Sequence, residues 1–244
     1  MKHPDIEIIK SIIKDSRSVV VTSHHNPDGD AIGSVIAMVK LLEKRVPQVT
    51  GIVPNDFPDF LKWMPGADRI VIYNQLEPKA KELIYNADLI FCLDYNALHR
   101  TDAMAPALKS ARAVKVLIDH HLDPLSEDFD YIISRIDISS TSELLFNFIE
   151  QCGWSDLIGQ EVATGLFVGI MTDTGSFSYS CNYPETFQIS ALLIKTGIDP
   201  EQIHRNVYDT YSESRLRLLG YCLGEKMTIL PQYKTAYIAL TKAE

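Results

Sequence analysis

The chain has 244 residues, of which 46% are hydrophobic, and its formal net charge is −9. This length and apolar content allow a full core in one large domain or two smaller ones. The acidic balance argues against a broad basic groove for long duplex nucleic acid, although two bound divalent cations would offset four negative charges. We find no apolar run of about 18 residues and no secretory leader, and therefore expect a cytoplasmic protein without a membrane segment. The four cysteines are widely spaced, as in core thiols of a reducing compartment: Cys92, Cys152, Cys181 and Cys222.

Short β-branched apolar runs alternate with segments of helical period over the first half of the chain. A helix is predicted over residues 31–44, where apolar side chains recur on one face. Strands that are buried on both faces and separated by helices indicate an α/β fold with a doubly wound, mainly parallel sheet flanked by helices. The predicted strands are residues 18–22, 49–53, 69–73, 89–93 and 114–118. The helix-like segments between them are residues 57–64, 77–87 and 102–111.

From residue 139 the sequence pattern becomes mostly helical. Ser140 and Glu143 have the spacing of a capping box, and Gly153 marks the end of the helix that follows. Further helices are predicted over residues 159–171, 184–195 and 200–208. Residues 225–230 and 234–241 alternate as a strand pair, which is only marginally stable alone. We therefore expect a catalytic domain over residues 1–211, a linker helix over 212–224, and the first hairpin of a second α/β domain over 225–244.

Metal-capable side chains follow the predicted strands. In open α/β sheets, ligands bind outside the carboxyl ends of the strands, so these side chains are expected to converge on one rim. Taken singly, each has a plainer explanation, such as a helix N-cap or the turn that Asn-Pro-Asp-Gly makes. Their coincidence at one end of the sheet favours a metal site. The residues are His24, Asp28, Asp30, Asp94, Asp119, His120, His121 and Asp173, the last after the apolar segment 166–172.

The mixture of carboxylates and imidazoles suits Mn²⁺, with Mg²⁺ or Co²⁺ as substitutes. A calcium loop that began at Asn26 would need Gly at Ala31 and Glu at Ala37. Zinc-type sulfur spacing and a His-Glu-x-x-His helix are not found. More ligands than one ion needs predict two ions about 3.5–4 Å apart, an arrangement that generates a hydroxide and clamps a phosphoryl group.

Four stretches resemble, in order, the motifs of the DHH phosphoesterase superfamily: "HHNPDGDAIGS", "CLDYN", "IDHH" and "TDTGSF". With "SSTSELL" and "YPETFQISALLIKTGID", the chain is most similar to the nano-RNase/pAp-phosphatase (oligoribonuclease) branch. The resemblance covers about residues 18 to 211 and implies a DHH-type catalytic domain. The Gly-Gly-Gly-His-type substrate loop of that branch is not found, so we expect most of its C-terminal DHH-associated domain to be lacking here.

The resemblance implies two metal sites that share one carboxylate, Asp94. The ligands of the first would be His24 and Asp28, and those of the second Asp30, His120 and Asp173. The catalytic pair would be His121, which orients the substrate phosphate or donates a proton, and Asp119, which fixes an imidazole.

Several neighbouring residues can be interpreted either as part of the functional site or as purely structural. His25 is either a ligand or, as we favour, a non-ligand. Gly29 and Gly33 are expected to let the backbone approach metal and phosphate. Hydroxyl groups at 139–141 could contact phosphate, although a helix cap explains them better. Aromatic side chains could stack a base, although core packing is the favoured use: Phe177, Tyr179 and Tyr183.

The resemblance implies a manganese-dependent phosphoesterase that hydrolyses short oligoribonucleotides and removes the 3′-phosphate of pAp through a metal-bridging hydroxide. A close variant hydrolyses linear dinucleotides of the pApA type. A pyrophosphatase or exopolyphosphatase would need a dense basic cluster, whereas only Arg205, Arg215 and Arg217 are near one another in sequence. A non-catalytic nucleotide-binding module would have lost at least one of the metal-ligand residues, and all of them are present in this sequence. The expected partner is a short oligoribonucleotide or phosphorylated nucleotide, and a homodimer is left open.

Overall fold

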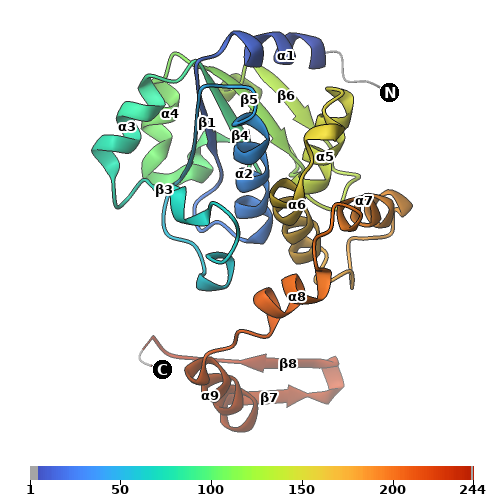
Figure 1. The fold of residues 1–244 in the computed structure, drawn as a ribbon. Helices are drawn as coiled ribbons and strands as arrows, with labels where there is room; N and C mark the ends of the chain where they lie inside the picture. Colours follow the sequence, from blue (N-terminus) through green and yellow to red (C-terminus); the bar gives the residue numbers. More distant parts are fainter. Residues whose placement is uncertain (1–4, 243) are drawn as a thin grey trace.

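The computed structural model describes residues 5–242 and 244, which form a six-stranded parallel sheet with helices on both faces (Figure 1). The strand order is β3-β2-β1-β4-β5-β6, and each neighbouring pair is parallel. The predicted doubly wound α/β fold is therefore confirmed. The strands are β1 (Ser18–Thr22), β2 (Gln48–Val53), β3 (Val71–Ile72), β4 (Leu89–Leu93), β5 (Val114–Asp119) and β6 (Tyr131–Ser134).

Alternate residues of the central strands supply two separate cores. In β4, Leu89, Phe91 and Leu93 face one core, and Ile90 and Cys92 face the other. Successive side chains of a strand point to opposite faces, so a strand with both faces covered is apolar throughout. The first core lies under α1 (Ile6–Asp15), α2 (Gly29–Leu42), α5 (Thr141–Gln151) and α6 (Gln160–Asp173), and the second under α3 (Glu77–Tyr85) and α4 (Ala105–Ser110).

The winding of the sheet reverses between β1 and β4. Strand β1 pairs in parallel with both β2 and β4, and the chain leaves β1 into α2 on one face but leaves β4 toward α4 on the other. A crevice opens at such a reversal, outside the carboxyl ends of the two strands. This topology places the loops after β1 and β4 at the usual ligand-binding position of a doubly wound sheet.

Helices α2 and α6 cross at glycines. A Cβ atom on Gly33 would lie 2.4 Å from the carbonyl oxygen of Gly165, and one on Gly29 would lie 2.3 Å from Oγ1 of Thr172. The space beside these two glycines is filled by α6, which is by itself a reason for glycine at both positions; their expected approach to metal and phosphate stays a prediction. The close antiparallel packing also brings the first turn of α2 beside the last turn of α6, where Asp173 ends the helix.

The C-terminal part extends away from the sheet (Figure 1). After α7 (Pro184–Ile194) and α8 (Pro200–Tyr208), α9 (Glu213–Tyr221) leads to an antiparallel hairpin of β7 (Met227–Leu230) and β8 (Thr235–Ile238). The predicted strand pair is thus present. Its side chains are mostly exposed, including Ile229 at 61% and Tyr237 at 50%.

Some local predictions were wrong. Helix α1, which buries Ile6, Ile9 and Ile13, and strand β6 were not predicted. The segment 57–64 forms only a 3₁₀ turn at Asp59–Leu61, and the segment 102–111 is divided between a 3₁₀ stretch and the short α4. Such short elements are fixed by tertiary packing more than by their own periodicity. None of the helices in the described part of the chain is both long and apolar enough to cross a membrane.

Candidate metal centre

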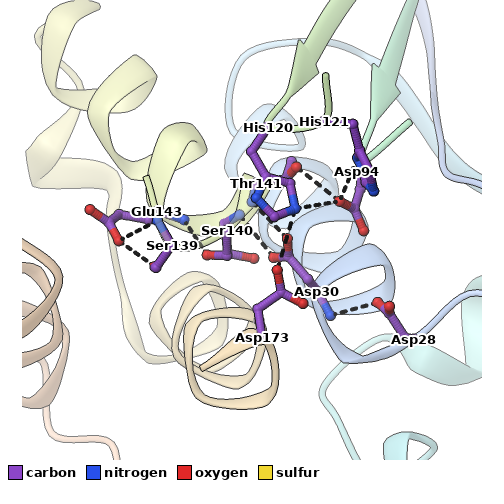
Figure 2. A network of polar contacts seen from close by, with 12 residues as sticks. Asp28, Asp30, Asp94, His120, His121, Ser139, Ser140, Thr141, Glu143 and Asp173 are labelled. Carbon is purple, nitrogen blue, oxygen red and sulfur yellow. Dashed lines mark hydrogen bonds and ion pairs between the residues drawn. The ribbon is translucent and has the colours of Figure 1, made fainter. Parts of the chain in front are cut away.

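The six side chains predicted as metal ligands lie together at the carboxyl-end rim of the sheet. Figure 2 labels Asp28, Asp30, Asp94, His120 and Asp173 among them. The ligand atoms of the six form two three-residue groups in which all atoms lie within 4.8 Å of one another, and a third group of the same size combines Asp94 and His120 with His121. Four separate parts of the chain contribute, namely the loops after β1, β4 and β5 and the end of α6. The first group is His24, Asp28 and Asp94, and the second is Asp30, His120 and Asp173.

The loop after β1 holds its side chains by capping α2. Asp28 is the N-cap residue, and its Oδ1 accepts the backbone N–H groups of Asp30 and Ala31 at 3.0 and 3.1 Å. Its other oxygen, Oδ2, lies 3.9 Å from Nε2 of His24. The ordinary N-cap interaction thus leaves one carboxylate oxygen facing the rim. The chain bends at Asn26, where φ is 56°, and then enters α2 at this N-cap residue, which aims the oxygen.

Asp30 lies at the start of α2 and is completely buried. Its two carboxylate oxygens accept the backbone N–H groups of Thr141 and Ser142, at 2.6 and 2.9 Å. These two amides belong to the first turn of α5, where helical N–H groups lack partners and where the helix dipole favours negative charge. The aspartate therefore joins α2 to α5, a contact that the sequence did not reveal.

Asp94 lies between the two groups. Its Oδ2 is 3.4 Å from Nε2 of His24, and its Oδ1 is 3.5 Å from Nε2 of His120. The hydroxyl of Thr141 donates to the same Oδ1 at 3.0 Å. Asp94 has a positive φ of 65°, which an aspartate adopts more readily than most residues. This backbone strain turns a buried carboxylate toward both imidazoles.

Two further side chains complete the second group. Nε2 of His120 lies 3.3 Å from Oδ2 of Asp173. Asp173 follows a helix rather than a strand, and it reaches the rim because α6 packs antiparallel to α2. A negatively charged group at a helix C-terminus is unfavourable without a nearby cation. The position is therefore suited to a cation that the surrounding carboxylates would share.

His121 groups with Asp94 and His120, and it also forms a close pair with Asp119. Nδ1 of His121 lies 2.7 Å from Oδ1 of the completely buried Asp119, and Oδ2 of Asp119 accepts the backbone N–H of His121 at 3.2 Å. The carboxylate raises the pKa of the imidazole. The pair thus fixes the ring orientation and favours the protonated form of His121.

Burial and mutual repulsion disfavour charge on the carboxylates. Desolvation, followed by the neighbouring carboxylates, raises the pKa of Asp173 to about 9 and that of Asp94 well above its usual value. Burial likewise raises the pKa of Asp30 to about 6. Desolvation lowers the pKa of His120, which favours the neutral imidazole that a metal requires. Without a cation, the carboxyl groups therefore tend to keep their protons, because excess negative charge would be poorly solvated there.

The donor set fits divalent metal ions. Each of the first two groups offers carboxylate oxygens and one imidazole nitrogen, a mixture that suits Mn²⁺ and related ions. The pKa values of the carboxyl groups are raised by burial and by mutual repulsion, and two bound cations would offset both effects. Asp94 belongs to the first group and has one oxygen directed to each side. The residues present therefore fit a two-ion site with one shared carboxylate.

The other candidates have different surroundings. Nε2 of His25 lies 3.7 Å from Oδ2 of Asp102, and His25 is in none of the ligand groups found among the described residues. The cap predicted at Ser140 is confirmed, since its hydroxyl accepts the N–H of Glu143. Phe177 packs between Phe167 and Phe187, as favoured. The prediction that Tyr179 and Tyr183 pack in the core was wrong, because both side chains are exposed.

The fold and the site together define a class of α/β proteins with a doubly wound sheet and a candidate metal centre at its reversal point. The family model "DHH family, N-terminal domain" matches residues 18–170, and the chain belongs to this family. The resemblance found in the sequence is therefore confirmed.

Two curated relatives show where in the family the chain lies. It is 26% identical over 246 residues to a probable bifunctional oligoribonuclease and PAP phosphatase NrnA of Streptococcus mutans, covering 95% of this chain and 72% of that protein. It is 23% identical over 202 residues to the corresponding protein of Mycoplasma pneumoniae, covering 82% of this chain and 59% of that protein. These relatives are consistent with the nano-RNase branch.

One solved structure is very similar. It is an exopolyphosphatase-related protein from Bacteroides fragilis, with 44% sequence identity and a TM-score of 0.95. The match covers 98% of this chain and 70% of that chain.

Proposed function

We propose that this chain is a divalent-metal-dependent phosphoesterase that hydrolyses short oligoribonucleotides and the 3′-phosphate of 3′-phosphoadenosine 5′-phosphate (pAp). The observation that carries the proposal is the gathering of two ligand groups around Asp94. The names of the two curated relatives, which describe oligoribonucleases and PAP phosphatases, support the substrate class.

In this proposal His24, Asp28 and Asp94 hold one ion, and Asp30, His120 and Asp173 hold the other with Asp94 shared. A pair of divalent ions supplies Lewis acidity and an activated water nucleophile for attack on phosphorus. Mn²⁺ is the expected ion because each group contains an imidazole. Mg²⁺ and Co²⁺ are the expected substitutes.

His121 acts on the substrate rather than on the ions. Its Nδ1 is held by Asp119, so the other ring nitrogen is free to meet the phosphate. The raised pKa of the imidazole keeps a proton there, which can be donated to the leaving oxygen. Asp119 is a positioning residue, since it acts through His121.

The test is an assay of the purified chain with Mn²⁺ on four substrates: pAp, an RNA dinucleotide, a longer RNA and pyrophosphate. We expect turnover of pAp and the dinucleotide, with little turnover of the longer RNA or pyrophosphate. Exclusive turnover of pyrophosphate would replace the proposal with a pyrophosphatase. Absence of turnover with Mn²⁺ bound would favour a binding module.

A further inference from the structure

A second group of polar side chains lies beside the metal centre. His25, His99, Arg100 and Asp102 line a cavity of about 430 Å³. They come from the loops after β1 and β4, the two strands at the reversal point of the sheet. The backbone N–H of His25 donates to the carbonyl oxygen of Arg100 at 2.8 Å, which ties the two loops together. None of the four belongs to the two ligand groups of the candidate metal centre.

Arg100 is the cationic group of this cavity. It is exposed, and within residues 5–242 and 244 its guanidinium makes no hydrogen bond or ion pair. By contrast, four other arginines each pair with a carboxylate within 2.8 Å: Arg69, Arg135, Arg205 and Arg217. A guanidinium is always charged and matches phosphate in a bidentate geometry.

The cavity adjoins the candidate metal centre through the chain itself. His25 directly follows His24, a member of the first ligand group, and Nδ1 of His24 lies 2.9 Å from the carbonyl oxygen of His25. The backbone N–H of His25 in turn donates to the carbonyl oxygen of Arg100. The cavity is therefore next to the metal centre rather than on a remote surface.

The remaining lining also suits an anion. Asp102 is the single carboxylate, and it is directed toward His25, with 3.7 Å between Oδ2 and Nε2. Against this one negative charge stand the guanidinium and two imidazoles, each of which can donate a hydrogen bond. Asp102 thus holds His25 in place and leaves His99 and Arg100 available.

We propose that Arg100, with His25 and His99, forms a second anion subsite that binds the phosphate group of the substrate that is not hydrolysed. This inference rests on the proposed function and specifies its substrate class. One phosphate lies at the ligand groups and His121, and a second phosphate, on the far side of the same ribose, reaches Arg100. The preferred substrates are then nucleotides with two phosphate groups, such as pAp, over nucleotides with one.

The experiment compares pAp with adenosine 3′-monophosphate, which differs only by the 5′-phosphate. We measure the ratio of the two kcat/KM values with Mn²⁺ for the full chain, for Arg100→Gln and for Arg100→Lys. The ratio should fall about tenfold to hundredfold in Arg100→Gln, because a charge-assisted contact is lost, and recover partly in Arg100→Lys. The matched control is Arg112→Gln, an exposed arginine just before β5, at the opposite end of the sheet.

An unchanged ratio in Arg100→Gln, or an equal fall in Arg112→Gln, overturns the subsite while leaving the proposed function intact. If the wild-type chain hydrolyses neither nucleotide, the proposed function fails and the subsite is decided by binding. Calorimetry then gives Kd for the same two nucleotides with Mn²⁺. Tighter binding of pAp that is lost in Arg100→Gln supports the subsite, and equal binding overturns it.

Discussion

Asp30 accepts the backbone N–H of Thr141 at 2.6 Å, although 111 residues separate the two. The contact joins the start of α2 to the start of α5 and uses both oxygens of a buried carboxylate. Asp30 is therefore a structural link as well as a candidate ligand. Among the described residues, no backbone N–H donates to the carboxylate of Asp173, which faces the rim.

This difference predicts unequal effects of two similar substitutions on the metal-free chain at pH 8. Asp30→Asn removes a carboxylate whose burial is unfavourable, but its amide group would face a backbone N–H and leave a buried donor unpaired, at a cost of about 1–3 kcal/mol, so Tm should change little. Asp173→Asn removes a repelled carboxylate without this loss and should raise Tm. Thermal unfolding in a chelator measures both. An equal rise in both variants would show that the α2–α5 link contributes no stability.

Loss of either of two carboxylate ligands should abolish activity and leave the fold intact. Asp94→Asn and Asp173→Asn should each retain less than about a tenth of wild-type hydrolysis at saturating Mn²⁺. The control is Asp156→Asn, an exposed aspartate in the 3₁₀ turn Ser155–Leu157. Hydrolysis and circular dichroism are measured together. Activity above that level in a folded variant would remove the residue from the ligand set.

The two adjacent histidines should have separable roles. His120→Ala should lower metal content, whereas His121→Ala should lower kcat with metal content retained. Asp119→Asn should resemble His121→Ala with a loss of about 10–100-fold, since it disturbs the orientation of that ring. Metal analysis beside steady-state kinetics distinguishes these effects. Equal metal loss in both histidine variants contradicts the assignment.

The metal-free chain should lose stability as pH rises. A carboxyl whose pKa is higher in the folded than in the unfolded state stabilises the fold when protonated, fully below about pH 4, and this contribution disappears as pH passes the folded pKa. The folded pKa values are about 6 for Asp30 and about 9 for Asp173. The shift at Asp30 alone, from 3.8 to about 6, corresponds to about 3 kcal/mol.

The measurement is Tm from pH 5 to pH 9 in a chelator. We expect a steady decrease, which Mn²⁺ should flatten and Asp173→Asn should reduce at the alkaline end. A flat metal-free profile would mean that the carboxylates are better solvated than their burial indicates.

We propose that residues 1–211 fold without the rest. The buried cores end at Val207, and α9 and the hairpin contact mainly one another. A chain that ends at residue 211 should therefore keep its helical signal, and its Tm should lie near that of the full chain. Turnover of an activated aryl phosphodiester should be affected less than turnover of a dinucleotide, because remote contacts contribute binding energy. Unfolding of the shortened chain contradicts this division.

Much of the fold was predictable because the information is local. The β-branched runs identified five of the six sheet strands, since a strand covered on both faces is apolar along its whole length. The order of strands and polar loops predicted a metal site at the carboxyl ends, because parallel strands share one rim. Residues such as Asp28 and Asp94 could be selected from their positions directly after those strands.

Other features depend on packing between distant segments. Asp173 reaches the rim because Gly33 and Gly165 let α2 and α6 approach closely, and a glycine in sequence does not reveal which helix will fill its space. Thr141 meets Asp94 only after α5 docks on Asp30. Arg100 meets His25 through a backbone hydrogen bond between two loops. The spacing of apolar residues along the sequence determines which side chains are buried. Only tertiary packing decides which buried side chains, and which polar side chains at the rim of the sheet, become neighbours.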